Sequence, residues 1–324
     1  MTTVKDVAKA AGVSPITVSR VVNAPDSVRP QTRARVEQAM AELQYAPNAA
    51  AKNLVTNRSG VVDVYVPENI DLSNPFVMHL IAGISKVLSD HMYSFLILRS
   101  RRREHRCDGY IVTGLLKDEI REFERYATER ERPLVLFGHT ELPNVDCIDV
   151  DNVAGARLGA EHLIALGHKD IAMINVDEDK DYTVDRLVGY RQALQEHGLP
   201  CGEERVVYVP NSVDGGIQAI RLLLERGAFT AAFCATDTIA IGVASELARM
   251  GHRVPEDFSL VGFDGLGHQL LAMPPITSVK QPIYEMGKML AQVLLERLDG
   301  HPDRIKRLVE PALLEGRSTA PSRA

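Results

Sequence analysis

The first 45 residues constrain this chain more strongly than any other segment. Apolar side chains recur at helical spacing from Val4 to Ala11, and Thr2 or Thr3 precedes them as a helix N-cap. Gly12 follows directly, at a place where a sharp turn needs a residue that tolerates a positive φ. The pattern therefore predicts a short helix that ends in a tight turn.

A second and a third helix are expected to follow. Ser14 caps the second, and Pro15 occupies its first position, where a missing N–H costs nothing. Pro30 begins the third. The apolar residues expected to pack together are Val4, Val7, Ala8 and Ala11, then Val13, Val18, Val21 and Val22, and finally Val36, Ala39, Met40 and Leu43. Two helices joined by a short glycine turn are typical of a helix-turn-helix, whose second helix lies in the major groove of DNA.

The distribution of charge agrees with a DNA-binding head. The whole chain has a formal net charge of −6, but residues 1–58 contain eight Lys and Arg against four Asp and Glu. A basic head on an acidic body attracts phosphates where contact is needed and repels DNA elsewhere. Charge alone would also fit a chance fluctuation in a short window, so the interpretation depends on the helical pattern.

The order of residues in this head resembles that of a known family. "VKDVAKAAGVSPITVSRVVN" and "VRPQTRARVEQAMAELQYAPNAAAKNL" are similar to the N-terminus of the lactose-repressor (LacI/GalR) family of bacterial transcription regulators. The resemblance implies that Pro15, Ile16 and Arg20 occupy base-reading positions, with Arg20 bidentate to a guanine edge. Phosphate contacts are implied for Thr17, Ser19 and Asn23. For the first two of these, helix capping or solvation is the plainer alternative.

Residues 47–58 are expected to form a hinge after the head. Pro47 ends the preceding helix, and Asn48 can cap a short alanine-rich helix over residues 49–55. A helix of this length is not stable alone in water. The resemblance implies that it folds only on operator DNA, where Leu54 wedges into the minor groove and kinks the duplex. A plain flexible linker is the alternative.

From residue 59 to 318, apolar strand-like runs alternate with amphipathic helical stretches, which is typical of parallel sheets covered on both faces. The expected strands are Val61–Val66, Ser94–Leu98, Tyr110–Thr113, Leu134–Phe137, Ile171–Ile174, Arg205–Val209, Ala231–Cys234, Ser259–Gly262 and Ile276–Val279. The expected helices include Asn74–Asp90, Val153–Leu166, Asp185–His197, Gly215–Arg226, Thr238–Met250 and Tyr284–Leu298. Two such sheets predict two Rossmann-like lobes, with a ligand cleft at the carboxyl ends of the strands.

The resemblance continues through this body. "GARLGAEHLIALGHKDIAMI", "DRLVGYRQALQEHGL", "ATDTIAIG", "DFSLVGFDG" and "PPITSVKQP" are similar to the family's type I periplasmic-binding-protein-like core. The resemblance implies a head over 1–46, the hinge over 47–58 and an effector-binding and dimerisation core over 59–318. Within the core, it implies a first lobe over 59–150 and 280–307 and a second over 151–279 and 308–318, with a tail over 319–324.

The resemblance also implies where an effector binds. Asn74 and Phe76 follow the first strand, at the mouth of the cleft. Arg186 matches the family's ligand-clamping arginine, and Asp264 matches a carboxylate that accepts hydrogen bonds from ligand hydroxyls or amines. An arginine and an aspartate that face each other across a cleft suit a neutral polyhydroxy ligand. A surface ion pair, or two independently solvated charges, is the alternative.

Other positions fit the family less closely. Thr236 and Thr238 follow a strand where the family more often has asparagine first, and each could equally be structural. Gly138 stands where several sugar-binding members have a polar residue, which leaves the choice of ligand open.

The connection over residues 99–107, "RSRRREHRC", is too short for a crossover helix. Parallel strands are normally joined through a helix, and the resemblance implies that one is absent here. An extended connection is long enough to pass over one neighbouring strand, and it would leave one face of the first sheet less covered. The arginines are expected to form a solvated loop.

Several function classes are not supported by any motif. The sequence contains no HExxH, GxSxG or P-loop pattern, and its four cysteines and ten histidines show no metal-ligand spacing. We therefore expect no enzyme activity, cofactor or metal. The chain has no apolar run of membrane-spanning length, and its first residues do not form a signal peptide, so we expect a cytoplasmic protein without a membrane partner.

The expected partners are double-stranded operator DNA, a small-molecule effector and a second copy of the chain. One half-site offers too little discrimination against a genome, so a homodimer on a pseudo-palindrome is expected. A sugar or sugar derivative is the leading effector class, and a nucleoside or purine is the alternative. A nucleotide-binding enzyme is the remote rival.

Overall fold

The computed structural model describes residues 2–23, 27–45, 58–100 and 105–323. They form two compact units, Met1–Gly60 and Val61–Ala324, which are described separately below. The hinge residues Asn48 and Leu54 lie outside the described residues, and so does the side chain of Asn23.

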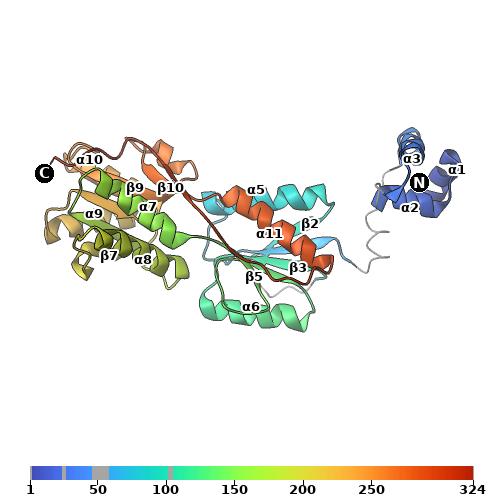
Figure 1. Ribbon diagram of the computed structural model, residues 1–324, viewed down its shortest axis with the longest axis horizontal. Helices are drawn as coiled ribbons and strands as arrows, with labels where there is room; N and C mark the ends of the chain where they lie inside the picture. The colour runs from blue at the N-terminus through green and yellow to red at the C-terminus, as the bar shows by residue number, and fades with distance from the viewer. Residues whose placement is uncertain (1, 24–26, 46–57, 101–104, 324) are drawn as a thin grey trace. The chain divides into compact units, whose positions relative to one another are not determined.

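The first unit contains three helices, α1 (Val4–Ala11), α2 (Pro15–Asn23) and α3 (Pro30–Glu42) (Figure 1). Thr3 rather than Thr2 is the N-cap of α1, and it forms a reciprocal capping box with Asp6. Gly12 adopts a left-handed φ of 62°, as the turn requires. The buried core of this unit is Val7, Ala8, Ala11, Val18, Val21, Val36 and Ala39. The predicted helix-turn-helix is therefore confirmed, together with most of its expected core.

The second unit contains two six-stranded sheets. The first has the order β11-β5-β4-β3-β1-β2, and the second has the order β12-β10-β9-β8-β6-β7. The strands of the first sheet are β1 (Val61–Tyr65), β2 (Ser94–Leu98), β3 (Gly109–Val112), β4 (Leu134–Phe137), β5 (Asp146–Val150) and β11 (Lys306–Val309). Those of the second are β6 (Ile171–Val176), β7 (Val206–Val209), β8 (Ala231–Cys234), β9 (Ser259–Asp264), β10 (Thr277–Lys280) and β12 (Ala312–Leu314). All pairs are parallel except β10 with β12, which confirms the predicted α/β class.

Helices cover both sheets. Around the first sheet lie α5 (Pro75–Asp90), α6 (Lys117–Glu129) and α11 (Ile283–Leu298), and Figure 1 shows α5 beside α11 with α6 on the opposite side. Around the second lie α7 (Asn152–Ala165), α8 (Asp181–Glu196), α9 (Val213–Arg226) and α10 (Asp237–Arg249). The remaining elements are two short 3-10 helices, Glu203–Arg205 and His268–Leu271. We call the first sheet with its helices lobe 1 and the second with its helices lobe 2.

The chain passes between the lobes three times: after β5, after β10 and after β11. The boundaries expected at residues 279 and 307 fall inside strands, because β10 remains paired to Lys280 and β11 to Val309. The expected tail is fastened to lobe 2. Ala320 donates its backbone N–H to Ser259, and Ser322 donates its own to the carbonyl of Leu166.

Three strands were not among those expected from the sequence: β5, β11 and β12. Strand β5 was missed because it carries two aspartates, Asp146 and Asp149, although all five of its residues are buried. Asp146 is tolerated there because Arg297 and Arg304 each donate to its carboxylate at 2.7–2.9 Å. The groups that neutralise Asp146 lie far from β5 in the sequence, so the sequence of β5 alone shows no apolar pattern typical of a buried strand.

The connection from β2 to β3 passes over β1, because β1 lies between the other two in the sheet. The predicted crossing of one strand is thus confirmed, and no helix is found in the described part of this connection. Leu96 of β2 pairs with Asp63 of β1 and is 46% exposed. His105, from the connection itself, covers Asp63, with Nε2 at 2.7 Å from Oδ1. The side chain of Asp63 is only 2% exposed, and His105, together with the neighbouring thiol of Cys107, provides the hydrogen bonds that this burial requires.

We expect His105→Ala to lower the free energy of unfolding by about 1–3 kcal/mol, since it leaves a buried carboxyl without its partner. Urea unfolding of the intact chain measures this change. His252→Ala, at an exposed position, is the matched control and should stay within about 0.5 kcal/mol of the parent. Equal unfolding midpoints for both variants would show that His105 does not stabilise the shortened connection.

Candidate functional site

Helix α2 presents a mixed surface to solvent. Val18 and Val21 hold the helix against α1 and α3, while Pro15, Ser19 and Arg20 are exposed on its other side. Ile16 is 66% exposed, an unusual position for a large apolar side chain on a small unit. Ile16 and Arg20 are four residues apart and share one face of the helix.

Thr17 has a local structural role. Its Oγ1 lies 2.9 Å from Ser14 Oγ, and its backbone N–H donates to the same oxygen at 3.2 Å. These bonds close the first turn of α2, so the capping alternative describes this conformation of Thr17. The hydroxyl retains a lone pair and stays partly accessible, which leaves a phosphate contact a prediction.

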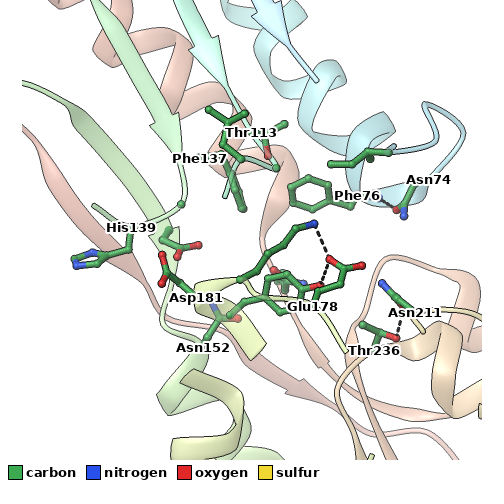
Figure 2. Close-up of a pocket in the computed structure, with 18 of the residues that line it drawn as sticks. Asn74, Phe76, Thr113, Phe137, His139, Asn152, Glu178, Asp181, Asn211 and Thr236 are labelled. Carbon is green, nitrogen blue, oxygen red and sulfur yellow. Dashed lines mark hydrogen bonds and ion pairs between the residues drawn. The ribbon is translucent and has the colours of Figure 1, made fainter. Parts of the chain in front are cut away.

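The second unit contains a cavity of about 380 Å³ between the carboxyl ends of its two sheets. Lobe 1 contributes Phe76 at the start of α5, Thr113 after β3 and Phe137 at the end of β4. Lobe 2 contributes Thr236 after β8 and Asp264 at the end of β9. Figure 2 shows the side chains of Phe76 and Phe137 on one side of this cavity and that of Thr236 on the other. The position at the strand ends is the one expected for an open α/β ligand site.

Arg186 of α8 is buried at the floor of this cleft, with 4% of its surface exposed. Its Nε donates to Asn152 Oδ1 at 2.9 Å, and Nη1 donates to the carbonyl oxygen of Ala235. The guanidinium also packs over the ring of Phe263 at 3.6 Å. These contacts hold the planar group in one orientation. Arg186 is therefore neither a surface ion pair nor a solvated charge.

Asp264 lies beside it in the same lobe. Arg186 and Asp264 both belong to lobe 2, so they do not face each other across the cleft as expected. Gln281 Nε2 donates to Asp264 Oδ1 at 2.7 Å, and the backbone of Asp264 has a φ of 129°. Such a backbone conformation is costly for a residue other than glycine and persists only where the surroundings hold it. Burial raises the pKa of this carboxyl, and the charge of Arg186 opposes that rise.

A second carboxyl, that of Asp237, lies near Asp264. Asp237 is buried, accepts hydrogen bonds from Ser278 Oγ at 2.5 Å and from the backbone N–H of Gly265 at 2.8 Å, and organises the turn after β9. Burial, followed by repulsion from Asp264, raises its pKa. The floor of the cleft thus holds one guanidinium and several carboxyls in a restricted space.

The other predicted effector residues are placed in different ways. Asn74 and Phe76 both line the cavity. Asn74 caps α5 by accepting from the N–H of Phe76, whose ring packs edge-on against Phe137 at 4.9 Å. Thr236 also lines the cavity, but its hydroxyl donates to Asn211 Oδ1 and accepts from the N–H of Ile239, which caps α10.

Thr238 does not line the cavity. It lies inside the first turn of α10, where successive side chains turn away from one another by about 100°. Two positions separated by one residue therefore do not share a face. Gly138 does line the cavity and contributes no side chain there.

The sequence analysis missed several lining residues, among them Thr113, Asp149, Tyr182, Asn211 and Gln281. Thr113 and Gln281 directly follow strands β3 and β10, so their position at a strand end was an available signal. Asp149 could not be found in this way, because its strand was not recognised. Tyr182 belongs to the first turn of α8, which begins four residues earlier than expected.

Comparison with known proteins identifies both units in one family. Residues 3–48 match the model of the bacterial regulatory proteins of the lacI family, and residues 160–319 match a periplasmic binding protein-like domain. The chain is 37% identical to the uncharacterized HTH-type transcriptional regulator YvdE of Bacillus subtilis over 301 residues, 92% of this chain and 93% of that protein. The chain belongs to the LacI family of bacterial transcriptional regulators. It is thus a DNA-binding regulator with an effector-binding domain, and not an enzyme.

Other LacI-family relatives extend over nearly the whole chain. The HTH-type transcriptional regulator CelR of Thermobifida fusca is 36% identical over 95% of both chains. A solved complex of CelR with cellobiose has a TM-score of 0.74 at 33% identity, covering 98% of this chain and all of that one. The lac repressor dimer bound to operator and the anti-inducer ONPF has a TM-score of 0.76 at 28% identity, covering 98% and 99%.

Two searches of the described residues were negative. No helix among them is long and apolar enough to cross a membrane. The same residues contain no group of three or more histidine, cysteine, aspartate or glutamate side chains placed to hold a metal ion.

Proposed function

We propose that this LacI-family chain is a cytoplasmic transcriptional repressor that binds a pseudo-palindromic operator as a homodimer. We further propose that a sugar or sugar derivative in the cleft controls its affinity for DNA. The cleft itself carries the proposal. It is large enough for a sugar, it lies between two lobes, and it combines aromatic rings with fixed hydrogen-bonding groups. The cellobiose complex of CelR supports the same ligand class. A nucleoside or purine remains the alternative, because the same rings would stack on a base.

The DNA-reading residues in this proposal are Pro15, Ile16, Thr17, Ser19, Arg20 and Asn23 of α2, with Asn48 and Leu54 of the hinge. The effector-binding residues are Asn74, Phe76, Arg186, Thr236 and Asp264. Exposure of Ile16 and Arg20 on one helix face supports the first set. The shared cavity supports the second.

Exposed apolar side chains support the dimer. Leu270, Leu271 and Met273, on the segment between β9 and β10, are 63%, 80% and 91% exposed. A contiguous group of large apolar side chains at the surface is typical of a protein contact. The lac repressor was solved as a dimer on its operator, which is consistent with this assignment.

Coupling would act through the relative position of the lobes. Lys117 of α6 in lobe 1 forms an ion pair with Asp181 of α8 in lobe 2, with 2.9 Å between Nζ and Oδ1. A ligand that binds both lobes stabilises one lobe arrangement over others and so shifts the population of states. Through a dimer, that shift changes the spacing of paired heads and the affinity for DNA.

Fluorescence-anisotropy titration of selected palindromic duplexes tests the proposal. The intact chain should bind tightly with a steep dependence on salt, and a chain that starts at Gly60 should not bind. Adding neutral sugars such as cellobiose, and then nucleosides, should identify one class that changes the affinity of the intact chain. Equal or absent binding by both chains would overturn the regulator proposal.

A further inference from the structure

Two buried polar side chains on the lobe 1 wall of the cleft retain hydrogen-bonding capacity. Asp149, at the end of β5, is 7% exposed and lines the cavity. The only hydrogen bond found for its carboxylate within the described residues is from the N–H of Val150, at 2.8 Å. Thr113 is 1% exposed, also lines the cavity, and its Oγ1 is buried without a partner in the same part of the structure. Buried polar atoms normally have partners, so the hydroxyl of Thr113 indicates a ligand, and the carboxylate of Asp149 can accept further hydrogen bonds from one.

The strand register places these groups on three neighbouring strands. Val112 pairs with Leu136, and Phe137 pairs with Ile148. Thr113 therefore follows β3 beside Phe137, whereas Asp149 lies one residue beyond the partner of Phe137, with β4 between β3 and β5. A carboxylate, a hydroxyl and an aromatic ring thus line the cavity from three neighbouring strand ends.

The positive charges of the cleft are largely committed elsewhere. Lys180 lines the cavity but is paired with Glu178 at 2.7 Å, and Lys117 is paired with Asp181. Arg186 is the buried cation of the floor, and it faces Asp149, Asp237 and Asp264 together. One guanidinium offsets the charge of only part of this group, and burial raises the pKa of the three carboxyls because isolated buried charges are strongly disfavoured. The pocket therefore has room for an additional positive charge.

The rings of the cleft favour the same kind of charge. Phe76 and Phe137 pack edge-on beside the Thr113 strand end, and the ring of Tyr182 lines the cavity from lobe 2. Figure 2 shows Thr113, Phe76 and Phe137 on the same side of the cavity. An ammonium group is attracted to the faces of aromatic rings as well as to carboxylates. The same rings pack against the apolar faces of a sugar.

We propose that the effector is a polyhydroxylated amine, of which an amino sugar is the simplest kind, that its ammonium group binds Asp149, and that Thr113 bonds a neighbouring polar group of the same ligand. This inference rests on the proposed function and narrows its ligand class. The hydroxyl groups of the ligand would bind Asp264, Asn211 and Arg186 in lobe 2. Asp149 then selects an amine over the corresponding neutral sugar.

The ionisation of Asp149 gives the proposal a second consequence. Burial raises the pKa of Asp149 to about 7, with the charge of Arg186 opposing the rise and that of Asp185 adding to it. His139, from the segment after β4, is the remaining group that faces it. At about pH 6 the free protein therefore holds a proton on this carboxyl. An ammonium that binds there displaces the proton, so binding should be accompanied by proton release.

Isothermal titration calorimetry on the intact chain compares matched pairs: D-glucosamine with D-glucose, D-galactosamine with D-galactose, and the disaccharide of glucosamine with cellobiose. N-acetylglucosamine keeps the nitrogen but removes its charge and carries a larger substituent. We expect at least one amine to bind on the order of tenfold to a hundredfold more tightly than its neutral partner. Repeating that titration at about pH 6 in two buffers of different protonation enthalpy should show proton release.

Asp149→Asn keeps the shape of the side chain and removes its charge, so the preference for the amine should disappear. Asp118→Asn, at a position 93% exposed on α6, is the matched control and should retain the preference. Circular dichroism establishes that both variants are folded. Tighter or equal binding of the neutral partners, or binding of none of the amines, overturns the inference.

Failure of this inference can be told apart from failure of the proposed function. If a neutral sugar changes the operator affinity of the intact chain and no amine does, the regulator proposal stands and an amine as the effector is refuted. If the intact chain binds no operator, the proposed function itself fails, whatever binds in the cleft.

Discussion

Arg186→Ala should lower the free energy of unfolding by about 3–5 kcal/mol and abolish effector control of operator binding. The loss is large because Arg186 is 4% exposed and bonded to Asn152 and Ala235. Its removal leaves buried carboxyls at the floor of the cleft without the guanidinium that offsets their charge. Urea unfolding measures the first effect, and anisotropy with and without effector, below the unfolding transition, measures the second.

Two further variants separate charge from geometry at this position. Arg186→Lys keeps the charge but loses the planar arrangement of donors. We therefore expect its free energy of unfolding to lie between those of the parent and the alanine variant. Arg253→Ala removes an exposed arginine paired with Asp257 and should change stability by less than about 1 kcal/mol. An Arg186→Ala chain as stable as Arg253→Ala would show that the buried guanidinium does not hold the floor together.

Arg20→Ala should remove most of the preference for operator over unrelated DNA. A bidentate arginine–guanine contact contributes about 1–3 kcal/mol of discrimination, and a dimer loses two of them, about 2–6 kcal/mol in total. The helix core does not include Arg20, so the head should remain folded. Parallel titrations of the selected palindrome and a scrambled duplex, at several salt concentrations, give the ratio of affinities.

Two comparisons sharpen this test. Arg20→Lys retains the charge but not the two parallel donors, so non-specific binding should survive while the preference falls. Arg35→Ala removes an exposed charge from α3 and should leave the ratio of specific to non-specific affinity unchanged. If Arg20→Ala and Arg35→Ala lower both affinities equally, Arg20 contacts phosphate rather than a base.

Local residue chemistry accounts for most of the fold that could be predicted. In the head, Gly12 follows the last residue of α1, and Pro15 and Pro30 are the first residues of α2 and α3. The nine expected strands of the body all occur, because each is a short apolar run between helical stretches. Strands β5 and β11 could not be recognised because charged residues interrupt their patterns, and β12 because it is only three residues long. Their pairing depends on neighbours that the local sequence does not contain.

The site was predicted less completely than the fold. Asn74, Phe76, Arg186, Thr236 and Asp264 do line one cavity, although they are up to 190 positions apart in the chain. The geometry among them was not predictable. Arg186 and Asp264 belong to one lobe, and the opposing wall combines the predicted Asn74 and Phe76 with Thr113 and Asp149, which were not predicted as site residues.

The sequence by itself determined the helix-turn-helix head, the alternation of strands and helices, and the shortened connection before β3. Each of these depends on residue type and spacing over a few turns of chain, which are visible without a structure. Only the tertiary structure decided which strand ends are neighbours, and therefore that Thr113, Phe137 and Asp149 share a wall. It also decided that Arg186 is buried rather than solvated, because burial depends on what distant segments pack around a side chain.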